Sequence, residues 1–256
     1  MTEGDRTPEA VAAVPGEGAL RWAVIVPVKA AAFGKSRLDV PGTDRAALAR
    51  AIALDTIAAA ASCGLVERVF VVTDDGGLVL HATDIPGLRF VPEVDPGGLD
   101  ALVARGAVTP ARSRLDAAIA RGIETAGERM PRAALLGDVP ALRPGDLADA
   151  LREAASVDRA VVPDAEGTGS TLVTARAGVT WESAFGDGSF ARHIALGCVP
   201  LPVGVASTLR RDVDTADQLA AASALGLGPR TRAVLSPGAA GVAGASSAAG
   251  DRESTR

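Results

Sequence analysis

Residues 133–142 read Ala-Ala-Leu-Leu-Gly-Asp-Val-Pro-Ala-Leu, the pattern of a buried strand that ends in an acid. Four consecutive apolar residues are typical of a strand covered on both faces, as in a parallel sheet flanked by helices. Gly137 and Asp138 then put a carboxylate at the carboxyl end of the strand, the edge at which open α/β sheets bind ligands. Because Pro140 blocks a direct continuation into helix, we predict that Asp138 lies in a loop at that edge.

On both sides of this stretch, strand and helix patterns alternate along the chain. Apolar runs predict strands at 22–28, 69–73, 88–92, 160–163 and 170–174, and an extended segment at 199–203. Helical spacing and capping residues predict helices at about 44–63, 111–130, 144–155 and 215–225, with a short helix ending at His193. Repeated βα units predict an α/β fold with one mostly parallel, doubly wound sheet, and the hairpin 160–174 predicts an antiparallel insertion in it.

The two ends of the chain differ in composition from its centre. Residues 1–19 are rich in Pro, Gly, Ala and Glu without periodicity, and residues 236–256 are rich in Gly, Ala and Ser. Such segments bury too little apolar surface to fold, so we predict disordered tails. Residues 20–235 remain as a single domain, long enough to enclose a sizeable core.

Composition also limits the partners and the compartment. The net charge of −5 and the scattered arginines disfavour nucleic-acid binding. Cys63 and Cys198 have no metal-binding spacing, which indicates reduced core thiols and no zinc site. No apolar run has the length of a membrane span, and the N-terminus lacks a basic region before a hydrophobic stretch. We expect a cytoplasmic protein without a membrane partner; its oligomeric state stays open, with a homodimer as one option.

A second acidic motif, Asp212-Val213-Asp214, occurs late in the chain after Arg210 and Arg211. Together with Asp138 it offers hard oxygen ligands of the kind that Mg²⁺ prefers. The alternative is that Asp138 and Asp214 each cap the helix that follows.

Cations and glycines follow the other strands. Lys29, Lys35 and Arg37 come after the first strand, where clustered cations suit a triphosphate, although a solvated loop is the alternative. The triplet 34–36 is not a Walker A loop, because Lys29 stands where that motif needs glycine. The loops 167–170 and 186–189 offer backbone amides and hydroxyls to a phosphate or carboxylate.

The two histidines, His81 and His193, have no acidic partner at the spacing of a hydrolase. We expect both to be structural.

Taken in order over about residues 22–235, these motifs resemble the guanylyltransferase family of coenzyme F-420 biosynthesis, which acts on 2-phospho-L-lactate or phosphoenolpyruvate. The resemblance is carried by 26–29, 35–38, 136–142, 167–170, 185–193 and 212–215. It implies a single-domain nucleotide-diphospho-sugar transferase-like fold, similar to that of the molybdenum-cofactor guanylyltransferases. It further implies that GMP passes from GTP to the phosphate of phosphoenolpyruvate, which gives enolpyruvyl-2-diphospho-5'-guanosine and pyrophosphate.

The resemblance also implies roles for particular residues. The Mg²⁺ ligands would be Asp138, Asp212 and Asp214. The GTP-binding residues would be Lys29, Lys35, Arg37 and Asp74. The catalytic residues would be Asp138, Lys29 and Lys35. The phosphoenolpyruvate-binding residues would be Ser170, Gly186 and Ser189. Relatives usually carry Gly-Leu-Asn where this chain has Arg114-Leu115-Asp116, which leaves a role of Asp116 in nucleotide binding open.

Other functions fit parts of the pattern. The acceptor could be 2-phospho-L-lactate or 3-phosphoglycerate, since these acids differ by small groups. A metal-dependent glycosyltransferase would use an Asp-x-Asp motif, but that motif ends a central strand in mid-domain, the place that Gly137-Asp138 takes here. A non-catalytic nucleotide-binding module is the third alternative, and it would release no pyrophosphate.

Overall fold

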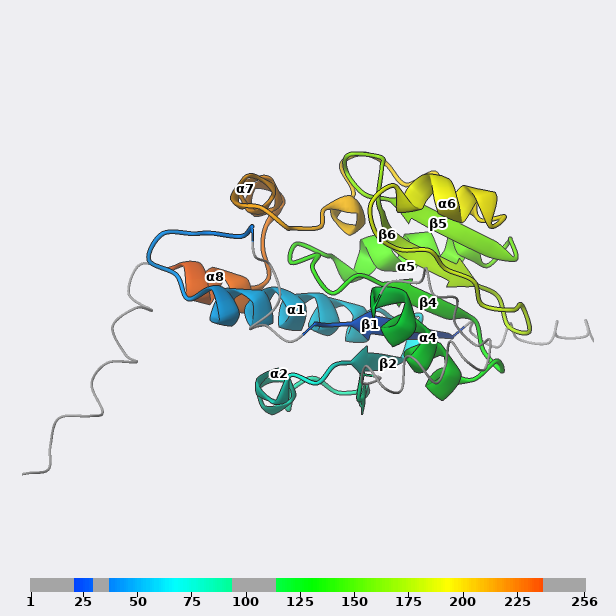
Figure 1. Ribbon diagram of the computed structural model, residues 1–256, viewed down its shortest axis with the longest axis horizontal. Coiled ribbons are helices and arrows are strands. Elements are labelled where there is room, and N and C mark those ends of the chain that lie inside the picture. The colour runs from blue at the N-terminus through cyan, green and yellow to red at the C-terminus, as the bar shows by residue number, and fades with distance from the viewer. Residues whose placement is uncertain (1–20, 30–36, 94–113, 237–256) are drawn as a thin grey trace, which may run out of the picture.

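The computed structural model describes residues 21–29, 37–93 and 114–236, and its strands form one sheet of seven (Figure 1). The strands are β1 Trp22–Pro27, β2 Val66–Val72, β3 Leu88–Val91, β4 Arg132–Leu135, β5 Arg159–Pro163, β6 Ser170–Ala175 and β7 Val199–Pro200. The helices are α1 Arg45–Ala61, α2 Gly76–His81, α4 Arg114–Ala126, α5 Pro144–Ala154, α6 Ser189–Ala195, α7 Ala216–Leu225 and α8 Pro229–Leu235, with a 3₁₀ turn η2 at Thr208–Arg210.

The strand order is β3-β2-β1-β4-β6-β5-β7. Strand β1 runs parallel to β2 and β4, β2 is parallel to β3, and β5 is parallel to β7. Strand β6 alone is antiparallel to its neighbours β4 and β5. The predicted α/β class, the mostly parallel sheet and the antiparallel insertion are therefore confirmed. As a result, the carboxyl ends of β1, β2, β4 and β5 and the start of β6 meet at one edge.

Helices cover both faces of the sheet, which is why β1 is buried along its whole length. On one face, Val24 and Val26 belong to a core that includes Ile57 of α1 and Leu151 of α5. On the other face, residues of β1 pack with Ile119 and other residues of α4. Apolar side chains that point to both faces of a central strand are what a doubly wound sheet requires.

The ends of the helices follow from local chemistry. The Asp44 carboxylate accepts hydrogen bonds from the first backbone amides of α1, and Thr215 forms a capping box with Gln218 at α7. Helix α4 ends at Ala126, earlier than predicted, because Gly127 adopts a φ of 77°.

Two short helices were missed by the sequence patterns, α2 and α8. Helix α8 lies against α1 (Figure 1), and its first amides, those of Arg230 and Thr231, donate to the Asp55 carboxylate of α1. That partner is 175 residues away from Arg230 in sequence, so a local pattern carries little information about it. The predicted tails fall almost entirely on residues that the structure does not describe.

Within the described ranges, no helix combines the length and the apolar character that crossing a membrane requires.

Gly122 on α4 tests the close approach of this helix to the sheet. A Cβ atom there would lie 2.5 Å from Ile25 Cγ2 and 2.9 Å from Val72 Cγ2. A Cβ atom added at Gly145 on α5 would have no neighbouring heavy atom within 4 Å. Both Gly→Ala substitutions gain helix propensity, so the difference between them isolates the clash. We expect Gly122→Ala to lower the free energy of unfolding in urea by about 1–3 kcal/mol relative to Gly145→Ala. Equal stabilities of the two variants would contradict this packing.

Candidate active site

A cleft of about 900 Å³ opens at the carboxyl edge of the sheet. Its walls come from the ends of β1, β2 and β4, from the β5–β6 turn, and from the segment that leads into α6. Most of the residues predicted for the site line it: Lys29, Asp74, Asp138, Ser170, Gly186, Ser189, Asp212 and Asp214. Arg37 is exposed and is not among the described residues that line the cleft, and Lys35 lies outside the described ranges.

Three carboxylates meet in the cleft, those of Asp138, Asp212 and Asp214. One oxygen of each lies within 4.8 Å of the other two. Asp138 follows β4, whereas the other two follow η2. Neither Asp138 nor Asp214 caps a helix, since the N-caps of α5 and α7 are Arg143 and Thr215. The capping alternative is therefore wrong.

Backbone hydrogen bonds hold the two acidic segments together. The Val213 amide, which lies between the two late aspartates, donates to the Asp138 carbonyl at 3.0 Å. The amide of Val139, the residue after Asp138, donates to the buried Thr56 hydroxyl of α1 at 3.0 Å. The separation of the carboxylates is thus set by main-chain contacts and by α1.

Gly137 allows this loop to pass close to β1. A Cβ atom there would lie 3.0 Å from the Pro27 carbonyl oxygen and 3.0 Å from Val28 Cγ2. This packing brings the loop that carries Asp138 beside the start of the segment that carries Lys29.

Burial and the neighbouring acidic charges raise the pKa of one of these three carboxylates. Burial, followed by the charges of Asp138, Asp164 and Asp214, raises the pKa of Asp212 to about 8. The Asp212 Oδ1 atom is buried and has no hydrogen-bond partner in the described part of the chain. Clustered carboxylate oxygens are a donor set that suits a hard divalent cation such as Mg²⁺.

Asp164, which follows β5, is a residue that the sequence patterns did not single out. Its buried carboxylate accepts hydrogen bonds from the Thr168 and Gly169 amides at 2.9 and 2.7 Å. Its carbonyl accepts from the Arg210 guanidinium at 2.8 and 3.1 Å. Asp164 therefore shapes the glycine turn and also ties it to η2. The available signal was an aspartate directly before a glycine-containing turn.

The opposite wall combines the two predicted glycine loops. The Phe190 amide donates to the Thr168 carbonyl at 3.1 Å and joins one loop to the other. Ser170 begins β6 and Ser189 begins α6, and their hydroxyl oxygens are 3.3 Å apart. Both serines are buried and line the cleft, so their hydroxyl groups form a pair on the same wall, which we call the hydroxyl wall.

Two buried side chains hold the segment before α6. The Asp116 carboxylate accepts from the Ser183 hydroxyl at 2.9 Å and from the Phe185 amide at 3.1 Å. His193 contacts Ser170 and the Ala184 amide, each at 3.0 Å. Asp116 is not among the described residues that line the cleft. Through these contacts Asp116 holds the segment before α6 against α4.

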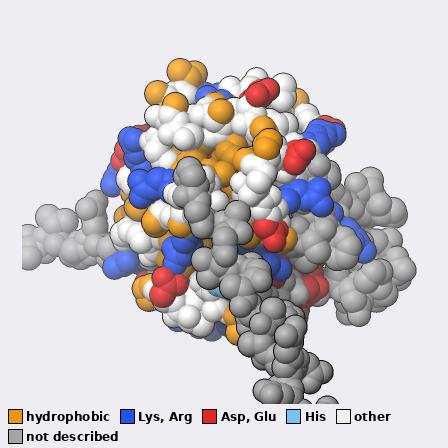
Figure 2. All heavy atoms as spheres, turned by 90° about the vertical axis from the view of Figure 1, so that its left-hand side faces the viewer, with side chains coloured by type: hydrophobic (Ala, Val, Ile, Leu, Met, Phe, Trp, Pro, Cys, Tyr) orange, Lys and Arg blue, Asp and Glu red, His pale blue; other side chains and the backbone are white. Residues whose placement is uncertain are grey.

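The far end of the cleft is polar and of mixed charge. The Asp74 carboxylate accepts from the Glu93 amide at 3.0 Å. The pKa of Glu93 is raised, first by burial and then by the charge of Asp74, while Arg114 and Lys29 act in the opposite direction. The face shown in Figure 2 likewise has acidic and basic side chains interspersed around apolar ones.

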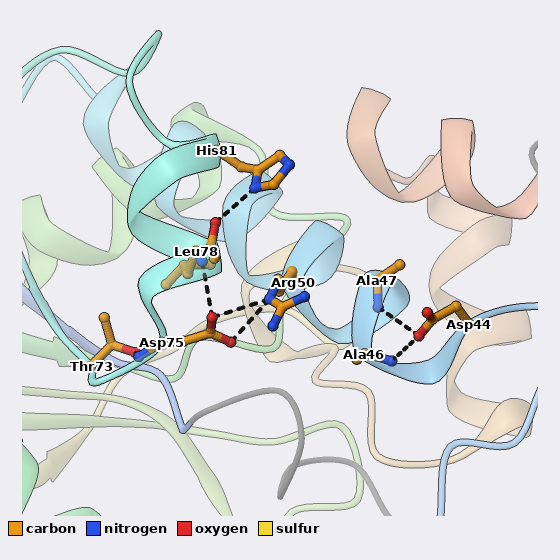
Figure 3. A network of polar contacts seen from close by, with 9 residues as sticks. Asp44, Ala46, Ala47, Arg50, Thr73, Asp75, Leu78 and His81 are labelled. Carbon is orange, nitrogen blue, oxygen red and sulfur yellow. Dashed lines mark hydrogen bonds and ion pairs between the residues drawn. The ribbon is translucent and has the colours of Figure 1, made fainter. Parts of the chain in front are cut away.

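The turn that carries Asp74 is anchored by its neighbour Asp75 (Figure 3). The Asp75 carboxylate accepts from Arg50 Nε of α1, at 3.1 Å to both oxygens, and from the Leu78 amide at 3.1 Å. The Asp75 amide donates to the Thr73 hydroxyl. A carboxylate that caps α2 while paired with α1 fixes the end of β2 against α1.

The chain is similar in sequence to several known proteins. No family model matches it. The chain is 42% identical over 227 residues to the phosphoenolpyruvate guanylyltransferase of Thermomonospora curvata, covering 86% of this chain and 93% of that protein. It is 44% identical over 216 residues to the phosphoenolpyruvate guanylyltransferase of Streptomyces scabiei, covering 84% and 95%.

A solved structure, that of the 4-diphosphocytidyl-2C-methyl-D-erythritol synthase from Anaerococcus prevotii, covers 80% of this chain and 96% of its own. Its sequence identity is 9% and its TM-score is 0.40, a likeness too distant to carry an argument.

The raised pKa of Asp212 predicts how the metal-free protein responds to pH. The folded state retains a proton that the unfolded chain releases near pH 4, so stability is lost as pH rises toward 8. Asp212→Asn removes this penalty. In EDTA at pH 8.5 we expect it to raise the free energy of unfolding by more than about 1 kcal/mol, and the gain should shrink at pH 4.5. Asp217→Asn, at an exposed position on α7, is the control. An equal gain in the free energy of unfolding at both pH values would refute the raised pKa of Asp212.

Proposed function

This chain belongs to the phosphoenolpyruvate guanylyltransferase family of nucleotidyltransferases, and on that premise we propose that it transfers GMP from GTP to the phosphate of phosphoenolpyruvate. Pyrophosphate and enolpyruvyl-2-diphospho-5'-guanosine would be the products, in a step of coenzyme F-420 biosynthesis. The observation that carries the proposal is the cluster of Asp138, Asp212 and Asp214 in one cleft that is also lined by Lys29 and by a wall of hydroxyls and glycines.

The two substrates are assigned to opposite sides of the acid cluster. GTP would lie toward Lys29 and Asp74, at the ends of β1 and β2, with Lys35 and Arg37 as further phosphate-binding cations. Phosphoenolpyruvate would lie toward the hydroxyl wall, where Ser170, Gly186 and Ser189 line the cleft. This division places the acceptor phosphate and the α-phosphate of GTP between the two walls.

The reaction is a displacement at phosphorus. An oxygen of the acceptor phosphate forms a bond to the α-phosphorus of GTP, the bond to the β-phosphate oxygen breaks, and pyrophosphate leaves with that electron pair. No covalent intermediate with the protein is needed, so the task of the protein is positioning and charge stabilisation. Lys29 supplies a positive charge beside the phosphates, and the hydroxyl wall orients the acceptor.

The acid cluster would hold Mg²⁺ through Asp138, Asp212 and Asp214. A bound Mg²⁺ neutralises the negative charge that builds up on the phosphate oxygens. The buried Asp212 oxygen without a hydrogen-bond partner and the raised pKa of Asp212 support this assignment, because a divalent cation would satisfy that oxygen and offset the clustered negative charge.

The choice of substrates is tested by measuring pyrophosphate release from the purified protein with Mg²⁺. GTP and ATP would each be combined with phosphoenolpyruvate, 2-phospho-L-lactate and 3-phosphoglycerate. We expect release with GTP and phosphoenolpyruvate and with no other pair. Release with another acid would overturn the acceptor assignment. Silence with every acid, despite measurable GTP binding, would indicate a non-catalytic nucleotide-binding module.

The role of Asp138 is tested by Asp138→Asn. The substitution keeps the size of the side chain but removes the charge that a cation needs, so the rate of pyrophosphate release should fall by on the order of 100-fold or more. Asp217→Asn, outside the cleft, should retain the wild-type rate. Circular dichroism and the unfolding midpoint confirm that both variants fold. Wild-type rates in a folded Asp138→Asn protein would sink the metal assignment.

A further inference from the structure

His193 is a fully buried imidazole behind the hydroxyl wall, with contacts at both ring nitrogens. Its Nδ1 atom lies 3.0 Å from the Ser170 hydroxyl oxygen. Its Nε2 atom lies 3.0 Å from the backbone nitrogen of Ala184. The ring of Phe185 packs edge-on against the imidazole with centroids 4.8 Å apart. The ring plane and both polar contacts are therefore fixed together.

The contact with Ala184 determines which nitrogen carries the proton. A backbone N–H can only donate, so Nε2 must accept and cannot carry a hydrogen. A neutral imidazole that accepts at Nε2 has its hydrogen on Nδ1. The Nδ1–H group therefore donates to the Ser170 hydroxyl oxygen.

The same reasoning determines where the Ser170 hydrogen points. The Ser189 hydroxyl oxygen lies 3.3 Å from the Ser170 oxygen, and when Ser189 donates, both lone pairs of the Ser170 oxygen are used. In that arrangement the Ser170 hydrogen points away from both His193 and Ser189. Because Ser170 lines the cleft, that hydrogen is available to a ligand there.

We propose that His193 is a positioning residue, which holds the Ser170 hydroxyl as a hydrogen-bond donor aimed at an anionic oxygen of the phosphorylated acceptor. The inference rests on the proposed function, because it takes the hydroxyl wall as the acceptor side of the cleft. Without the imidazole, the Ser170 hydrogen could turn toward the protein, and an anion would then face a lone pair.

The surroundings of His193 keep its imidazole uncharged, as the contacts with Ala184 and Ser170 require. Burial is the main cause that lowers the pKa of His193 to about 4, and the nearby charge of Arg192 acts in the same direction. The charge of Asp116 opposes them. At neutral pH the imidazole is uncharged, so Nε2 remains an acceptor and Nδ1 remains a donor.

Two amide substitutions separate the contacts of His193. The Asn amide nitrogen reaches the position of Nδ1, so His193→Asn can still donate to Ser170 but loses the Ala184 contact. The Gln oxygen reaches the position of Nε2, so His193→Gln can still accept from Ala184 but loses the donor to Ser170. We expect His193→Gln to raise KM for phosphoenolpyruvate about tenfold, with kcat and KM for GTP changed much less. His193→Asn should recover most of that loss.

A merely structural histidine gives a different pattern. Both variants would then lose kcat and both KM values together, in proportion to their loss of stability, and that outcome overturns the proposal. The cycle of His193→Gln, Ser170→Ala and the double variant adds a second readout. The double variant should be no worse than the worse single variant, whereas additive losses would contradict action through Ser170.

The tautomer can be measured on the wild-type protein without any substitution. Two-bond ¹H–¹⁵N correlations at pH 7 should place the His193 proton on Nδ1, with exposed His81 as an internal comparison. A proton on Nε2 or a charged ring would overturn the inference. An inactive wild-type protein would remove the proposed function and this inference together, whereas an active wild type with unchanged KM in His193→Gln would remove this inference alone.

Discussion

Three carboxylates repel one another, and the structure holds them within one cleft nonetheless. The force that opposes the repulsion is main-chain hydrogen bonding, above all the bond from the Val213 amide to the Asp138 carbonyl. Helix α1 reinforces the loop that carries Asp138, because the Thr56 hydroxyl accepts a hydrogen bond from the Val139 amide. Burial, and after it this repulsion, raises the pKa of Asp212. An arrangement that is electrostatically unfavourable by itself would be stabilised by a cation at the proposed site.

The antiparallel strand β6 has a matching role on the other side of the cleft. Because β6 runs against its neighbours, its first residue, Ser170, lies at the edge where the parallel strands end. Asp164 shapes the turn before it, and α6 brings Ser189 and His193 behind it. A single reversal of strand direction thus places the Ser170 hydroxyl at the edge where the parallel strands end.

The sequence predicted most of what depends on local pattern. Strand runs, helix caps and the glycine loops indicated the sheet and the edge at which the cleft lies, and the shared suitability of three aspartates as hard oxygen ligands led to the grouping of Asp138 with Asp212 and Asp214. Contacts made by a buried side chain with a distant amide were not predictable. Asp55 with α8 and Asp116 with the Phe185 amide are examples, because hydrogen bonding to a backbone leaves no signature in the partner's sequence. The expectation that His193 is structural stays a prediction, and its contact with Ser170 required the fold.

The central claim is that the acid cluster is a cation site shared with the triphosphate. The most direct measurement is anomalous X-ray scattering from crystals of the wild-type protein grown with GTP and Mn²⁺ in place of Mg²⁺. The account predicts a peak within direct coordination distance of the Asp138 and Asp212 carboxylates that also touches the phosphates. Ordered GTP in the cleft with no peak at this cluster, or with its cation held elsewhere, would contradict it.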